Sequence, residues 1–210
     1  MKGVFYCFLL AFIIPVAGWG QQKDFEGEIT YRQVVHSKLD NVSDEQMQSY
    51  FGDGVTVIIK HGNYRQHYLH ADGVTDVIYI SSLNRWFYKM KDIDTLFFRD
   101  CSTDTSRVIS LHKDTVTATI LGFACKTLRL ETSNFTLQYF YADSLYINPD
   151  NFTQHVFLHY NLYAMESKAV YLRLLGEGNL FTSELMATNL VGREISDNEF
   201  DLPKLPQVER

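Results

Sequence analysis

Histidine pairs are the first candidates for chemistry in this sequence. His155 and His159 are four residues apart and would share one face of a helix, which is the spacing of a zinc-binding pair. No glutamate follows His155 directly, so the zinc protease motif is absent. In a strand, His67 and His70 would point to opposite faces and would not chelate one ion together. We therefore interpret both pairs as hydrogen-bonded or surface imidazoles and predict no metal site.

Other catalytic groups are equally sparse. The acidic pairs Asp92/Asp94 and Asp197/Glu199 suit turns and strand edges better than a general acid and base. The sequence contains no Gly-x-Ser-x-Gly motif and no glycine-rich turn between a strand and a helix, which excludes the serine hydrolase elbow and the dinucleotide and P-loop sites. We predict a protein that is not an enzyme and has no cofactor.

The N-terminus has the features of a secretory signal peptide. Lys2 is followed by an apolar stretch from Val4 to Val16, and small residues stand at positions −3 and −1 of a cut after Gly20. About 13 apolar residues are too few for the roughly 20 that span a bilayer. No cysteine stands near Gln21 for lipid attachment, so we predict a soluble exported protein, periplasmic or extracellular, with residues 1–20 removed and without a transmembrane anchor.

Export affects whether the cysteines are expected to form a disulfide. Cys7 lies in the signal peptide, which leaves Cys101 and Cys125 in a compartment that favours disulfides. A bridge between them would close a loop worth about 3 kcal/mol in the chain-entropy model. We expect this disulfide; the alternative is two free thiols, one of them buried in a strand.

The composition indicates one compact β-rich domain. The 210 residues are 46% hydrophobic and include 15 Phe, 13 Tyr and 2 Trp, which is enough for a single sizeable core and excludes disorder. The net charge of −6, with no long basic run, argues against a nucleic-acid partner. We predict a single domain over residues 21–210, ending in a short tail at about 204–210.

Alternating polar and apolar residues predict many short antiparallel strands. In residues 25–35, Ile29, Tyr31 and Val35 would share one face and Glu28 the other. Short turn-rich gaps separate the candidate strands, which is typical of hairpins in a meander. The further candidates are Val55–Lys60, Tyr64–Leu69, Thr75–Ser81, Arg85–Lys89, Thr95–Arg99, Arg107–Leu111, Val116–Leu121, Lys126–Glu131, Phe135–Tyr141, Ala169–Leu175 and Leu180–Leu190.

Two segments interrupt the strands. Ser43 and Gln46 form a capping-box pattern and Gly52 offers a stop, so the sequence predicts a short helix from about Asp44 to Phe51. A second helix is expected from Pro149 to about Ala164, where aromatic residues recur at helical spacing behind a proline. A strand remains the alternative there, because Phe157 and Tyr163 do not sit cleanly on that stripe.

Three patches of the chain resemble a known family. Residues 119–126 read TILGFACK, with a glycine that would bend or bulge the chain between two strand pieces. This motif, the opening at residues 25–31 and the ending at residues 188–190 and 197–203 resemble the exported β-proteins of Bacteroidetes grouped as uncharacterised or GLPGLI-type. The Gly-Leu-Pro-Gly-Leu-Ile run itself is missing, and residues 163–175 stand where it would be.

The resemblance implies a fold like that of the LolA/LppX lipoprotein and lipid carriers. That fold is a single curved antiparallel sheet or incomplete barrel, covered by one or two short helices around an apolar hollow. It implies that Phe135, Leu137, Tyr139 and Tyr141, on one face of a strand, would line the hollow. The alternative is that these four side chains simply fill a core.

Two classes of function follow. The protein is a carrier or binding protein for a lipid or another apolar ligand, or it is an envelope or surface component that acts through contacts with another protein and has no ligand cavity. The first class follows from the resemblance in fold, and fold alone does not establish function.

Overall fold

The computed structural model describes residues 23–210, with the side chains of residues 115–117 left aside. The signal peptide expected at residues 1–20 lies outside the described residues. None of the helices in the described part has the length and apolar character that a membrane crossing needs.

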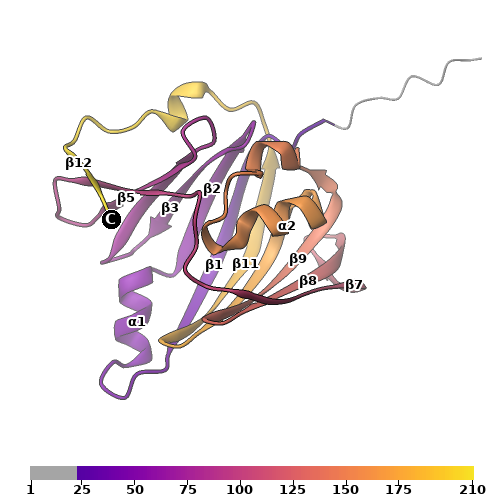
Figure 1. Ribbon diagram of the computed structural model, residues 1–210, viewed down its shortest axis with the longest axis horizontal. Coiled ribbons are helices and arrows are strands. Elements are labelled where there is room, and N and C mark those ends of the chain that lie inside the picture. The colour runs from indigo at the N-terminus through magenta and orange to yellow at the C-terminus, as the bar shows by residue number, and fades with distance from the viewer. Residues whose placement is uncertain (1–22) are drawn as a thin grey trace, which may run out of the picture.

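One large curved sheet forms the molecule (Figure 1). The prediction of a mainly β fold with an open, strongly curved sheet and short helices is confirmed. The strands are β1 (Gly27–Ser37), β2 (Gly54–Lys60), β3 (Asn63–Leu69), β4 (Val74–Ile80), β5 (Arg85–Met90), β6 (Leu96–Asp100), β7 (Val108–Ile120), β8 (Phe123–Thr132), β9 (Phe135–Tyr146), β10 (Ala169–Gly178), β11 (Phe181–Gly192) and β12 (Gln207–Glu209).

The strand order shows two meanders joined side by side. The order is β12-β6-β5-β4-β3-β2-β1-β11-β10-β9-β8-β7, so β1 of the first meander pairs with β11 of the second. Neighbouring strands are antiparallel except β12, which lies parallel to β6. The ends of the order, β12 and β7, are not paired with each other, so the sheet stays an open barrel.

Most strand predictions agree with the structure, with two differences. The separate strands expected at 107–111 and 116–121 form one strand, β7, whose pairing with β8 shifts register near Asp114 and Val116. Leu121 (φ 49°) and Gly122 (φ 83°) then make the two-residue turn between β7 and β8. The segment expected as a C-terminal tail contains β12, which the sequence analysis did not predict.

The first predicted helix is confirmed. Helix α1 spans Asp44–Phe51, the Ser43 hydroxyl accepts a hydrogen bond from the Gln46 amide, and the Gln46 side chain accepts one from the Ser43 amide. Gly52 ends the helix with φ 81°, where a Cβ would meet the Leu69 carbonyl oxygen.

The second predicted helix is wrong in its continuity. The structure has two 3₁₀ turns, η1 (Pro149–Phe152) and η2 (Phe157–His159), followed by helix α2 (Tyr160–Ser167). Leu158 and His159 adopt left-handed φ values of 54° and 52°, which interrupts the helix before α2 begins. We call residues 149–167 the cover segment, because it lies across the concave face of the sheet (Figure 1).

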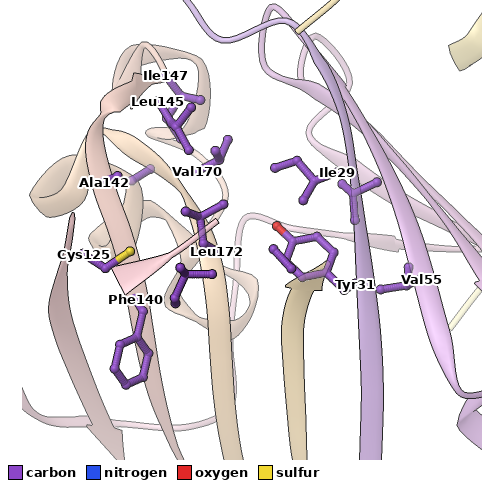
Figure 2. Close-up of a cluster of buried hydrophobic side chains, with 14 of the residues drawn as sticks. Ile29, Tyr31, Val55, Cys125, Phe140, Ala142, Leu145, Ile147, Val170 and Leu172 are labelled. Atoms are coloured by element: carbon purple, nitrogen blue, oxygen red, sulfur yellow. The ribbon is translucent and has the colours of Figure 1, made fainter. Parts of the chain in front are cut away.

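The main core lies between the two meanders. Ile29 and Tyr31 of β1 and Val55 of β2 lie on one side, and Val170 and Leu172 of β10 lie on the other (Figure 2). All five side chains are almost fully buried. The core therefore holds the two halves of the sheet in one curved unit.

The expected disulfide does not form, and that prediction is wrong. Cys101 and Cys125 are both free and buried in the main core. Cys101 follows β6 and Cys125 lies in β8, near opposite ends of the strand order, and each thiol contacts a backbone carbonyl two residues earlier in its own segment. Burial raises the pKa of Cys101 to about 12 and also raises that of Cys125, so both stay as thiols near neutral pH.

Candidate functional site

A cavity of about 210 Å³ lies between the concave face of the sheet and the cover segment. Its wall is mostly apolar and aromatic. Six of the side chains that line it are tyrosines. The strands contribute Tyr31, Val57, Ile59, Tyr64, Gln66, Tyr68, Trp86, Leu137, Tyr139, Val170, Tyr171, Leu174 and Leu185, and residues 147–160 contribute Ile147, Phe152, His155, Phe157, Leu158 and Tyr160.

Strand register places the sheet side of this wall. Tyr31 pairs with Val55, Val57 with Gln66, and Ile59 with Tyr64, so these side chains point to the same concave face. On the second meander, Tyr139 pairs with Leu174 and Leu174 with Leu185. The cavity therefore draws on β1, β2 and β3 as well as on β9, β10 and β11.

Packed aromatic rings hold the cover segment on the sheet. The ring of Tyr163 in α2 stacks on Tyr139 with 4.0 Å between centroids, and Tyr160 packs against Tyr64 of β3 at 6.2 Å. His155 lies 4.3 Å from the ring of Tyr79 in β4. These contacts fix the roof of the cavity against both meanders.

A few polar groups interrupt the apolar wall. The Tyr64 hydroxyl and Nε2 of His155 are 2.9 Å apart, and the Tyr31 hydroxyl donates to the Tyr171 carbonyl at 2.6 Å. The Tyr68 hydroxyl donates to Oε1 of Gln66 at 2.9 Å. Nδ1 of His155 is buried and has no hydrogen-bond partner among the described residues.

Burial keeps these groups uncharged. Burial lowers the pKa of His155 to about 4, so its imidazole is neutral at pH 7. It raises the pKa of Tyr171 to about 12 and holds the pKa of Tyr31, Tyr64 and Tyr160 well above the usual value for a phenol. At neutral pH the cavity wall carries no ionised histidine or tyrosine.

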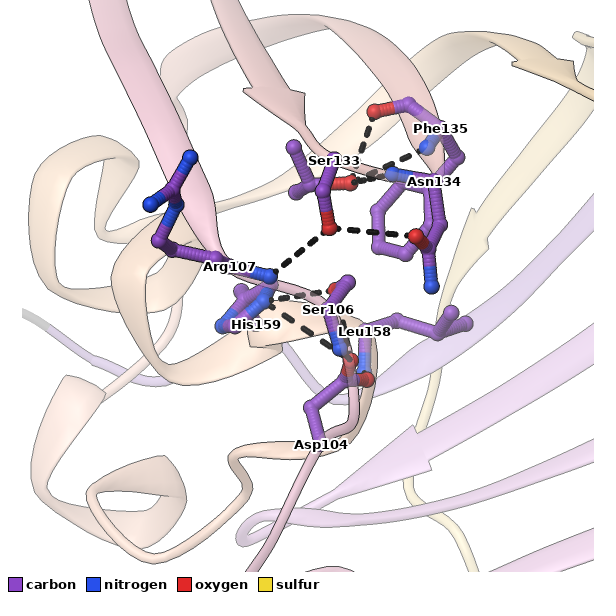
Figure 3. Close-up of polar contacts among 9 residues, drawn as sticks. Asp104, Ser106, Arg107, Ser133, Asn134, Phe135, Leu158 and His159 are labelled. Carbon is purple, nitrogen blue, oxygen red and sulfur yellow. Dashed lines mark hydrogen bonds and ion pairs between the residues drawn. The ribbon is translucent and has the colours of Figure 1, made fainter.

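A buried carboxylate fixes the middle of the cover segment (Figure 3). Oδ1 of Asp104 accepts hydrogen bonds from the Ser106 amide at 2.7 Å and the Ser106 hydroxyl at 2.6 Å, and Oδ2 accepts one from the Leu158 amide at 2.8 Å. Leu158 is one of the two left-handed residues and lines the cavity. We call Asp104, Ser106, Leu158 and His159 the Asp104 clamp.

The clamp contains the residue types of a serine hydrolase triad but not its geometry. Nε2 of His159 lies 3.0 Å from the Ser106 hydroxyl, while Asp104 lies 3.8 Å from that same nitrogen. In a triad the acid binds the other ring nitrogen and the serine proton goes to histidine. Here the serine hydroxyl is within hydrogen-bonding distance of Asp104 and His159, and serine and histidine are both buried. This arrangement cross-links the 101–107 loop to the cover segment.

The four side chains that the resemblance implied have different surroundings. Leu137 and Tyr139 line the cavity. Tyr141 is fully buried in a cluster with Leu128 and Tyr163, to which Tyr139 also belongs, and the Phe135 ring packs near His159 at 6.3 Å. The structure brings two of the four to the cavity and places the other two in packing contacts beside it.

The two histidines of the cover segment do not converge on one point. His155 faces Tyr64 and Tyr79, whereas His159 faces Ser106. No group of three or more metal-ligating side chains occurs among the described residues.

Most of the cavity wall was missed by sequence reasoning. Tyr31, Tyr64, Tyr68 and Tyr171 stand on strands that were predicted correctly, but alternation alone does not show which apolar face meets a cavity and which meets a core. The pattern of tyrosines at positions 64 and 68, on the same face of one short strand, was the available signal.

No protein-family model and no curated protein matches this chain. Among solved structures, PNGF-II in its P21 and C2 crystal forms is similar over 89% of this chain, at 14% identity and TM-scores of 0.49 and 0.47. This chain spans about a third of the length of PNGF-II, 32% and 31% in the two structures. LprF from Mycobacterium bovis is similar over 81% of this chain and 88% of its own, at 9% identity and a TM-score of 0.33. These similarities are too low to identify a function.

Proposed function

We propose that this protein is a non-catalytic binding protein for a small apolar ligand, held between the concave face of the sheet and the cover segment. The observation that carries the proposal is the aromatic and aliphatic wall of the 210 Å³ cavity. A cavity of about 150 Å³ with apolar walls holds benzene, whereas drug-sized ligands occupy about 300–1,000 Å³. The size favours one ring or a short chain over a whole lipid.

The absence of catalysis is part of the proposal. Ser106 is 8% exposed, and its hydroxyl donates to the Asp104 carboxylate. Asp104 lies on the same His159 nitrogen that faces Ser106, unlike the acid of a catalytic triad. The cysteines are buried, and the pKa of each is raised by burial. These features support binding without chemistry.

Export is a second part of the proposal. The charged and apolar pattern of residues 2–16, the small residues before Gln21 and the likeness of three patches to exported GLPGLI-type proteins support a role outside the cytoplasm. We expect the intact mass of the protein recovered from its source cells to match a chain that begins at Gln21. A mass that includes residues 1–20 would contradict export by this route.

Binding is tested on the purified full chain with propylbenzene as the probe. Saturation-transfer NMR is expected to show contact with the probe, and organic extraction followed by mass spectrometry is expected to release a small apolar compound. Leu174 lines the cavity, whereas Leu180 is 55% exposed in the turn before β11. We expect L174W to lose probe binding because the indole fills the cavity, and L180W to keep it.

Circular dichroism of both variants separates loss of binding from loss of folding. If folded L174W binds propylbenzene as well as wild type does, the cavity is not the site. If wild type binds no probe and releases no compound, the protein is not a binding protein of this kind, and action through protein contacts becomes the better hypothesis.

A further inference from the structure

We propose that the ligand is a neutral molecule that carries a hydrogen-bond-accepting oxygen, such as a carbonyl, which phenol hydroxyls of the cavity bind. This inference rests on the proposed binding function and narrows the class of ligand. It follows from three features of the cavity: unused phenol hydroxyls, the absence of charge in the wall, and the arrangement of the polar groups already satisfied.

Unused hydroxyls are the first feature. Tyr139, Tyr160 and Tyr171 line the cavity, and their hydroxyls form no hydrogen bond within the described part of the chain. In contrast, Tyr163 of α2 is not part of the cavity wall, and its hydroxyl donates to the Ala169 carbonyl at 2.7 Å. Tyrosine hydroxyls in apolar surroundings usually have a partner. These three oxygens are not among the fully buried unpaired atoms, so a ligand or water in the cavity can supply that partner.

Tyr139, Tyr160 and Tyr171 lie close together in the cavity wall. The ring centroids of Tyr139 and Tyr171 are 5.7 Å apart, and the rings of Tyr139, Tyr160 and Tyr171 all pack against the ring of Tyr163. Tyr160 comes from α2, Tyr139 from β9 and Tyr171 from β10, so the cover segment and the sheet each present a donor. A single ligand oxygen with two lone pairs can accept from two of them.

The lack of charge is the second feature. No Asp, Glu, Lys or Arg is among the described residues that line the cavity. His155 is neutral at pH 7, so an anionic ligand would meet no opposite charge. Burying an unpaired ion costs several kcal/mol, which argues against a carboxylate ligand.

The same cost bears on a cation. Tyrosine and tryptophan faces attract ammonium groups, and the gain reaches about 2 kcal/mol or more when the pair is desolvated. No carboxylate is among the described residues of the wall to complete such a site, and an ammonium group has no acceptor for the unused hydroxyl protons. A neutral acceptor satisfies these donors without a desolvated charge.

The satisfied polar groups are the third feature. Tyr31, Tyr64 and Tyr68 already donate to, or share a proton with, the Tyr171 carbonyl, His155 and Gln66. These contacts hold the rings in place. The ligand therefore meets fixed walls, with the donors of Tyr139, Tyr160 and Tyr171 still free.

Calorimetric titration of the full chain with four probes tests the inference. The probes are acetophenone, propylbenzene, benzoate and phenyltrimethylammonium, which share one ring and differ in polar group and charge. We expect acetophenone to bind at least as tightly as propylbenzene, although its carbonyl loses water on binding, and we expect each charged probe to bind at least tenfold more weakly.

Variants that lack a single tyrosine hydroxyl test which group binds the ligand oxygen. Y160F and Y171F keep the rings and remove one hydroxyl each. We expect at least one of them to weaken acetophenone binding about fivefold, equivalent to about 1 kcal/mol for one hydrogen bond, and to leave propylbenzene binding unchanged. Tyr50 is 43% exposed on α1, away from the cavity, and Y50F is the control that should change neither.

The outcomes separate the two proposals. Suppose that propylbenzene binds. The neutral-acceptor inference is then overturned if acetophenone binds more weakly than propylbenzene, if neither Y160F nor Y171F weakens acetophenone binding, or if a charged probe binds best. The proposed binding function would still stand in each of these cases. If none of the four probes binds, the binding function fails and the inference fails with it.

Discussion

At the scale of single residues, buried polar atoms distinguish packing sites from the cavity. Tyr141 and Tyr163 belong to the same buried cluster, and their rings meet edge to face at 6.4 Å. The Tyr163 hydroxyl donates to a carbonyl, whereas the Tyr141 hydroxyl is buried with no partner among the described residues. An unpaired buried hydroxyl costs about 1–3 kcal/mol. The unpaired hydroxyl of Tyr141 therefore lowers the free energy of unfolding of the native protein.

We expect Y141F to raise the free energy of unfolding by about 1 kcal/mol, because it removes the unpaired hydroxyl and keeps the ring. The ring contact with the Lys113 ammonium, 5.9 Å from the ring centroid, is retained in the variant. Urea unfolding followed by circular dichroism measures the change. The matched control is Y163F, which breaks the bond to the Ala169 carbonyl and should be destabilising. A loss of stability in Y141F would mean that its hydroxyl has a partner in solution.

At the scale of elements, the cover segment depends on the Asp104 clamp. Two successive left-handed residues, Leu158 and His159, are each costly for a side chain with a Cβ. The hydrogen bond from the Leu158 amide to Asp104 compensates part of that cost. Burial opposes ionisation of Asp104, but hydrogen bonds from Ser106 and Leu158 and the proximity of His159 outweigh it and lower the pKa of this carboxyl. The carboxylate form is thus built into the clamp.

We expect D104N to lower the free energy of unfolding by about 1–3 kcal/mol, because the amide nitrogen would face a hydrogen-bond donor in place of one carboxylate oxygen. It should also weaken propylbenzene binding, since Leu158 lines the cavity. Urea unfolding and the calorimetric titration measure the two effects. Asp94 is exposed, and D94N should change stability by less than about 0.5 kcal/mol. Equal stability of D104N and D94N would show that the clamp does not hold the segment.

The elements also show what sequence reasoning can and cannot reach. Helix α1 was predicted to the residue because its signals, Ser43, Gln46 and Gly52, act within one short stretch of chain. The cover segment was predicted as one helix because its aromatic spacing is helical. The left-handed turn at Leu158 and His159 is favoured by Asp104, which lies more than 50 residues earlier, and no local pattern reports such a contact.

At the scale of the whole molecule, the candidate site is less predictable than the fold. Alternation identified the strands, because a half-buried strand imposes a period of two. It did not distinguish Tyr139, which lines the cavity, from Tyr141, which lies two residues away in the same buried cluster but is not part of the cavity wall. That difference depends on where α2 packs on β9, and the tertiary structure is not encoded in the alternation along one strand.

Stability of the whole molecule should depend on pH through His155. Its pKa is about 4 in the folded protein because of burial, against about 6.5 when exposed. Between these values the unfolded chain binds a proton that the native protein does not, so the free energy of unfolding falls as pH falls from about 6.5 to 4. The loss approaches about 3 kcal/mol at the lower end. The rings packed against His155 are Tyr64, Tyr79 and Tyr160, which carry no charge in this range.

Urea unfolding at a series of pH values measures this loss. We expect H155Q to flatten the slope between pH 6.5 and 4, whatever its stability at pH 7. The control is H70Q, whose side chain is 81% exposed in the wild type and which should leave the slope as it is. A slope in H155Q equal to that of wild type would assign the acid sensitivity to other groups.

The pairing of β1 with β11 has a consequence for the order of folding. Gly27 pairs with Gly192, so the seam between the two meanders joins residues 165 positions apart, whereas the pairs inside each meander are close in sequence. Contacts of such long range form slowly and late. Each meander can form from local hairpins, but the concave face is complete only after β1 has paired with β11. In refolding, β structure should therefore appear before binding competence, and during synthesis β1 must wait for nearly the whole chain before its partner exists.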